Sequence, residues 1–168
     1  TATALKLGVA GRRDREPQLA LFPRAELRTS TTPHLEQLRY GDDGEWRACI
    51  MVPIRLVSEA NRRMLTKGAV FAHAARTRKQ KTAVRLALDS LVGTTPPSPP
   101  LHVTLTRIAP CPLDDDNLAG SAKYVRDAIA EWLGVNDRRR ELVRYHYDQR
   151  KGGKGVYAVE IRIEQRAI

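Results

Sequence analysis

Several stretches of the chain alternate apolar and polar residues, as a strand with one buried face does. The clearest are residues 101–108, LHVTLTRI, and residues 156–163, VYAVEIRI. Residues 48–57 and 142–147 are predicted as two further strands, and Pro53 in the first of them indicates a sheet edge or a bulge because proline cannot donate to a ladder. These stretches predict a small β-sheet.

Two helices are predicted from apolar residues that recur at helical spacing. The first covers about residues 72–92 and the second about residues 117–132. Their apolar stripes are Val84, Leu88 and Leu91 in the first and Leu118, Ala122, Val125, Ile129 and Trp132 in the second. Gly134 stands where a glycine commonly ends a helix. Together these elements predict an α/β (α+β) fold, a small mixed sheet flanked by two main helices.

The first 47 residues are predicted to form an irregular N-terminal extension of unknown function, because three prolines, Pro17, Pro23 and Pro33, interrupt any long element. Within it, residues 33–38 suit the start of a helical turn. Residues 48–168 are long enough for one domain with a real core. Near the end of the chain, residues 148–155 are rich in glycine and positive charge, and they predict a hairpin turn.

Three consecutive carboxylates, Asp114, Asp115 and Asp116, lie between the strand at 101–108 and the second helix. In an extended backbone, Asp114 and Asp116 would point to the same side. Two close carboxylates repel each other, so a cation commonly holds such a pair, and oxygen ligands suit Mg²⁺ or Mn²⁺. The alternative is an acidic helix N-terminus with Asp116 as the N-cap.

The net charge of the chain indicates what kind of partner it binds. It is +10, with 29 Lys and Arg against 19 Asp and Glu. A basic excess of this size favours a polyanionic partner, nucleic acid first and an anionic membrane second. No apolar run approaches the length of a membrane span, and of the two partners we expect nucleic acid and no membrane. The two cysteines, Cys49 and Cys111, have no metal-ligand spacing, and we expect a cytoplasmic location.

The acidic run and the residues after it resemble the RusA family of Holliday-junction resolvases, which includes phage and prophage endodeoxyribonucleases. The resemblance rests on Asp114-x-Asp116-Asn117-Leu118, then Lys123-x-x-x-Asp127-Ala128-Ile129, then Gly134-x-x-Asp137. It also includes the turn Ser58…Asn61-Arg62 and spans about residues 48–164, so the N-terminal extension lies outside it.

The resemblance implies a Mg²⁺- or Mn²⁺-dependent homodimer that cuts four-way DNA junctions during recombination and repair, in the nucleoid of a bacterial or phage-infected cell. By position, Asp114, Asp116 and Asp137 would be catalytic metal ligands. Lys123 matches the family's catalytic lysine if residues 119–121 are an insertion; otherwise Gly120 stands at that place. Asn136 departs from the pattern, because the family often has a second acid there.

Basic residues near these motifs are expected to contact DNA phosphates with little sequence preference. Three of them, at spacing i, i+3 and i+7, line one face of the first helix. The expected DNA-binding residues are Asn61, Arg62, Arg63, Arg78, Lys81, Arg85, Arg138, Arg139, Arg140, Arg150, Lys151 and Lys154. By contrast, His73 is expected to be an incidental polar residue, since no second ligand lies one helical turn away.

Two other classes of function remain open from the sequence. A basic DNA- or RNA-binding protein could keep the fold without the activity, with its acids serving as helix caps. A structural phage component could use the N-terminal extension for assembly.

Overall fold

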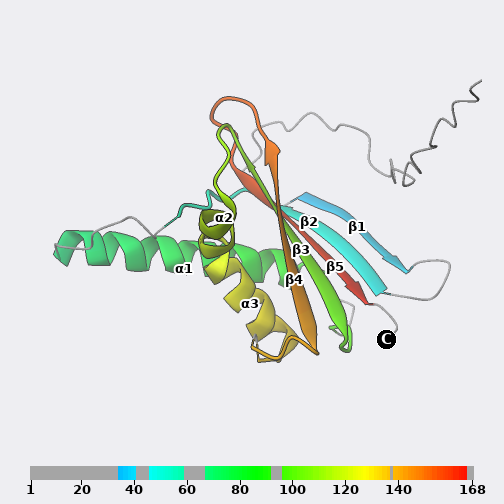
Figure 1. Ribbon diagram of the computed structural model, residues 1–168. Coiled ribbons are helices and arrows are strands. Elements are labelled where there is room, and N and C mark those ends of the chain that lie inside the picture. Colours follow the sequence, from blue (N-terminus) through cyan, green and yellow to red (C-terminus); the bar gives the residue numbers. More distant parts are fainter. Residues whose placement is uncertain (1–33, 41–45, 59–66, 92–95, 137, 166–168) are drawn as a thin grey trace, which may run out of the picture.

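A computed structural model of the chain (Figure 1) describes residues 34–40, 46–58, 67–91, 96–136 and 138–165. Five strands form one sheet in the order β1-β2-β5-β3-β4. The strands are β1 His34–Tyr40, β2 Trp46–Val52, β3 Leu101–Ala109, β4 Val143–Lys151 and β5 Ala158–Gln165. The helices are α1 Lys67–Asp89, α2 Asp115–Ser121 and α3 Lys123–Leu133. The predicted mixed α/β architecture is therefore confirmed.

The sheet is mixed because β4 runs parallel to β3, while β1–β2, β2–β5 and β3–β5 are antiparallel pairs. Since β3 lies between β4 and β5, the predicted hairpin turn at 148–155 is wrong. Strand β4 continues to Lys151, and the chain then crosses the end of β3 to reach β5. The backbone at Gly152 passes close to the end of β3, where the Gly152 N–H donates to the Ala109 carbonyl at 2.9 Å.

Helices α1 and α3 pack on one face of the sheet. Alternate residues of each central strand point toward them, which is the expected consequence of the two-residue period of a strand. This core contains Ile50 and Val52 of β2, Leu101, Val103 and Leu105 of β3, Val159, Ile161 and Ile163 of β5, and Val84, Leu88, Val125 and Ile129 of the helices. Burying each such side chain stabilises the fold by roughly 1.5–3 kcal/mol.

The single helix predicted for residues 117–132 is instead two helices, α2 and α3, with a break at Ala122. The Ala122 N–H bonds the Ala119 carbonyl at 3.3 Å, and the Ser121 hydroxyl donates to the Leu118 carbonyl at 2.7 Å. A serine that bonds back to the preceding turn bends or ends a helix, and Gly120 before it weakens the helix further. Gly134 ends α3 with φ 66°, as predicted.

Other element boundaries also differ from the prediction. Helix α1 begins at Lys67 and ends at Asp89, and Figure 1 shows that its N-terminal half projects beyond the sheet. Phe71 on this half is 74% exposed. Residues 34–40, within the segment predicted to be irregular, form β1 and pair with β2 rather than starting a helical turn. No helix in the described ranges has the length and apolar character needed to cross a bilayer.

Candidate active site

The acidic run begins α2 and does not continue β3. Asp114 is the N-cap, with extended backbone angles, while Asp115 and Asp116 occupy the first helical turn. The predicted extended arrangement, with Asp114 and Asp116 on one side of a strand, is therefore wrong. The alternative prediction, an acidic helix N-terminus with an aspartate cap, is confirmed, but the N-cap is Asp114 rather than Asp116.

Asn117 holds the Asp114 carboxylate through two hydrogen bonds. Its backbone N–H donates to Asp114 Oδ1 at 2.9 Å, and its side-chain Nδ2 donates to Asp114 Oδ2 at 2.7 Å. The Ser58 hydroxyl in turn donates to Asn117 Oδ1. Asn117 thus joins the connection after β2 to the acidic turn, and it fixes the orientation of the carboxylate.

These bonds also lower the pKa of Asp114. The side-chain and backbone hydrogen bonds from Asn117 lower the pKa of the Asp114 carboxyl below its ordinary value. Hydrogen bonds to the ionised form of a carboxyl group favour that form. An ionised carboxylate has about four lone-pair sites, and capping occupies two of them. The remaining sites face solvent, because Asp114 is exposed.

A second brace comes from Gln149 of β4, a residue that the sequence did not identify. Its Nε2 donates to the Leu113 carbonyl at 2.7 Å, and the Leu113 N–H donates to its Oε1 at 2.9 Å. Arg107 of β3 adds a third contact, since its Nη1 donates to the Cys111 carbonyl at 2.8 Å. Gln149 follows Val143, Tyr145 and Tyr147 on the side of β4 that faces the core. A polar residue at such a position is the feature of the sequence that could have identified it.

Two carboxylates in one helical turn suit a magnesium ion, which is commonly held by one or two carboxylates, with water and substrate phosphate completing its octahedron. Asp114 and Asp116 fit this demand by donor type. Among the described residues, no group of three or more His, Cys, Asp and Glu side chains is arranged to hold a metal ion. Asp137, the expected third acid, lies outside the described residues, as do Asn61, Arg62 and Arg63.

Lys123 begins α3 and is exposed. Because the helix breaks at Ala122, Lys123 does not lie two turns along the same helix as Asp116. Its Nζ lies 5.8 Å from the centroid of the Tyr124 ring. The Tyr124 hydroxyl is 2.9 Å from His73 Nε2, and the two rings meet edge to face. His73 is thus a packed polar residue where α1 meets α3.

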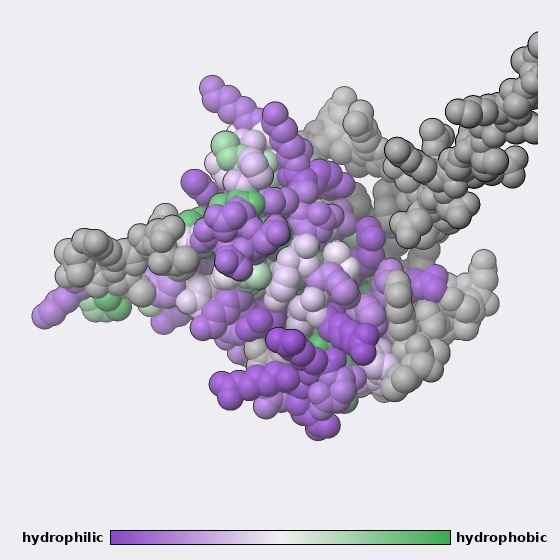
Figure 2. Space-filling view, viewed as in Figure 1, coloured by the Kyte–Doolittle hydropathy of each residue, from purple (hydrophilic) through white to green (hydrophobic). Residues whose placement is uncertain are grey.

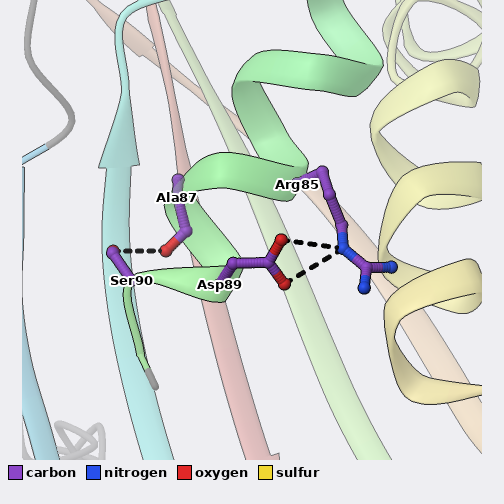
Figure 3. Close-up of polar contacts among 4 residues, drawn as sticks. All are labelled: Arg85, Ala87, Asp89 and Ser90. Carbon is purple, nitrogen blue, oxygen red and sulfur yellow. Dashed lines mark hydrogen bonds and ion pairs between the residues drawn. The ribbon is translucent and has the colours of Figure 1, made fainter.

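Several of the predicted DNA-binding side chains are paired with acids. Arg85 Nε bonds both carboxylate oxygens of Asp89 at 3.0 Å within α1 (Figure 3). Lys81 pairs with Glu131 of α3 at 2.6 Å, so α3 reduces the positive charge expected of this face. Two further pairs are Arg139 with Glu141 and Arg150 with Glu160. The expected DNA-binding residues Arg78, Arg138, Arg140, Lys151 and Lys154 are exposed.

The arginine run 138–140 lies at the other end of β3 from the acidic turn. Leu101, the first residue of β3, donates its N–H to the carbonyl of Leu142. Leu113 contacts Gln149, which is in register with Arg107, six residues further along β3. Six residues of strand span roughly 20 Å. The arginine run and the acidic turn therefore lie at opposite ends of β3.

The visible surface is mostly hydrophilic (Figure 2), in keeping with the charged residues that flank the sheet. The chain matches no protein-family model and no curated protein sequence.

Proposed function

We propose that the protein is a Mg²⁺- or Mn²⁺-dependent endodeoxyribonuclease that resolves Holliday junctions or other branched DNA during recombination and repair. The observation that carries this proposal is that side-chain hydrogen bonds hold the acidic turn in place. Asn117 orients the Asp114 carboxylate, and Gln149 fixes the backbone immediately before it. To cap a helix, Asp114 needs only its hydrogen bond with the Asn117 backbone. A site that positions an ion or a phosphate also needs a rigid turn, and the Gln149 contact makes this turn rigid.

The reaction would be hydrolysis of a phosphodiester. Oxygen from water forms a new bond to phosphorus while one ester P–O bond breaks, which leaves a phosphate monoester and a hydroxyl. Asp114 and Asp116 would hold the divalent ion, which when bound lowers the pKa of water and offsets charge in the transition state. Lys123 would neutralise developing negative charge on the phosphate.

Binding would depend on phosphate contacts and would weaken with salt. The exposed basic residues Lys151 and Lys154 lie in and after the end of β4, the strand whose Gln149 braces the acidic turn. A four-way junction has two strands to cut symmetrically, and a homodimer with two-fold symmetry would present two such turns. The expected cellular site is the nucleoid.

Incision of a labelled four-way junction tests the proposal. With Mg²⁺, wild-type protein is expected to cut the junction, and Asp116→Asn is expected to lower the rate by about 10²-fold or more, the scale on which loss of an electrostatic stabiliser acts. A matched control is Asp127→Asn, which removes the same charge from α3. Equal rates for wild type and Asp116→Asn contradict the catalytic proposal.

A second candidate function is a DNA-binding protein of the same fold without catalysis. The observation that favours it is that Asp114 caps α2 with both carboxylate oxygens engaged. This alternative predicts salt-sensitive junction binding with no incision in Mg²⁺ or Mn²⁺.

A further inference from the structure

An arginine near the acidic turn, Arg107, is buried and has no acidic partner among the described residues. Arg107 is only 8% exposed although it follows Leu101, Val103 and Leu105 on the core-facing side of β3. A guanidinium has five N–H donors, and one of these donates to the Cys111 carbonyl. Its Nε is buried without a hydrogen-bond partner, and no carboxylate within the described ranges pairs with it.

Another arginine, Arg55, acts on the charge of Arg107. Burial lowers the pKa of Arg107, and the nearby charge of Arg55 lowers it further, while Tyr157 acts in the opposite direction. Arg55 is exposed, and its Cζ lies 4.5 Å from the centroid of the Tyr157 ring. Gln80 of α1 also donates to the Arg55 carbonyl at 2.9 Å, so the backbone there is fixed.

Buried cations in proteins are normally paired, because an uncompensated charge in a poorly solvated site is energetically unfavourable. Arg107 and Arg55 carry like charges, and among the described residues no ion pair joins either of them to a carboxylate, which is the reverse of a structural ion pair. An anion that binds both would offset the repulsion and the desolvation together. Guanidinium donors match the oxygens of a phosphate group particularly well.

We propose that Arg107 and Arg55, with Tyr157 holding the Arg55 side chain, form a binding site for a phosphate group beside the acidic turn. The turn and the site share the connection after β3, since Arg107 bonds Cys111 and Asp114 follows three residues later. The phosphate could belong to a DNA backbone or be free phosphate. The site does not depend on catalysis, so it can be tested without a metal ion.

The test measures the affinity of a fluorescent four-way junction by anisotropy in EDTA, across roughly 50–200 mM salt. Arg55→Gln is expected to weaken binding about tenfold and to lower the slope of log K against log salt by about one, the loss of one phosphate contact. Arg107→Gln should do the same. Arg144→Gln, which removes an exposed arginine of β4 on another part of the sheet, is the control and should change affinity by less than about twofold.

A calorimetric titration with inorganic phosphate at matched ionic strength separates the two sources of phosphate. Unchanged DNA binding with phosphate binding that Arg55→Gln abolishes supports a site for free phosphate. Equal affinities of wild type and Arg55→Gln for both DNA and phosphate overturn the proposal, as does an equal loss in Arg144→Gln. Arg55 is exposed, so its variant decides the question even if Arg107→Gln does not fold. Loss of incision alone leaves this proposal unaffected.

Discussion

The side-chain amide of Gln149 pairs with the backbone of Leu113 as a neighbouring strand would. Nε2 donates to the Leu113 carbonyl at 2.7 Å, and the Leu113 N–H donates to Oε1 at 2.9 Å. One side chain therefore satisfies both backbone groups of the residue before Asp114. This contact couples the end of β4 to the position of the acidic turn.

Gln149→Ala is expected to lower the free energy of unfolding by about 1–3 kcal/mol, because it leaves two partly buried backbone groups without partners. Incision should fall by more than the stability change explains, since the turn loses its brace. Urea unfolding and single-turnover incision at a temperature where the variant is folded measure the two effects.

The matched control is Gln165→Ala. Gln165 also donates from its side chain to a backbone carbonyl, that of Ser98 at 3.1 Å, but it lies at the other end of the sheet, in register with Leu101. Its incision rate should equal that of wild type. An equal loss of incision in both variants would show that Gln149 has no particular role at the turn.

The acid dependence of stability should contain a contribution from Asp114. Its pKa is lowered by hydrogen bonds from Asn117, so the folded state favours the carboxylate. That contribution is complete above the ordinary Asp pKa of about 3.9 and is lost as pH falls through the lower, folded-state value. In Asn117→Ala, the Asp114 pKa should rise toward its ordinary value, as an NMR titration of the Asp114 carboxyl would show. An identical titration curve in the two proteins would contradict the assigned cause.

The crossing from β4 to β5 depends on a glycine at residue 152. A Cβ there would lie 3.1 Å from Cγ2 of the buried Ile108 and 3.3 Å from the Val156 carbonyl. Gly152→Ala should destabilise the fold by about 1 kcal/mol or more through this crowding. Gly153→Ala is the control, because its Cβ would meet Val156 Cγ2 at an ordinary 3.5 Å, and it should change stability by less than about 0.5 kcal/mol. Thermal unfolding of the two variants distinguishes them; equal midpoints would refute the close crossing.

If the α1 face contacts DNA, Glu131 opposes that contact by pairing with Lys81. Glu131→Gln should leave stability within about 1 kcal/mol, since exposed ion pairs contribute little. It should raise junction affinity about two- to fivefold at low salt, because one more positive charge becomes available to phosphate. Glu164→Gln removes the same charge from β5 and should have a smaller effect. Affinity that Glu131→Gln leaves unchanged would exclude this face from the DNA contact.

The sequence predicted the elements whose periodicity reflects burial on one face. Strand β3 and the helical residues Ala122, Val125 and Ile129 follow this rule, because alternate strand residues and every third or fourth helical residue meet the same core. Leu118, one turn before Ala122 in the same stripe, is also buried. The stripe continues across Ala122, so periodicity alone does not reveal the break between α2 and α3. The Gly120-Ser121 pair supplies that information.

Features set by contacts between distant segments could not be predicted in this way. Strand β1 follows Pro33 and has no clear alternation, and it forms because β2 offers a partner edge. The parallel pairing of β4 with β3 places Gln149 beside Leu113, and no local pattern specifies that register. For the candidate site, the acidic run and Asn117 were visible in sequence, whereas Gln149, Arg107 and Arg55 emerge only from the fold.

The central claim is that the turn containing Asp114 and Asp116 holds the divalent ion on which incision depends. Calorimetric titration of Mn²⁺ into metal-free protein, with and without a junction analogue that cannot be cleaved, tests this most directly. We expect wild type to bind one ion per chain, more tightly with DNA present, and Asp114→Asn and Asp116→Asn each to weaken binding at least about tenfold, the scale of a lost charged ligand. Wild-type affinity in both variants would contradict the account.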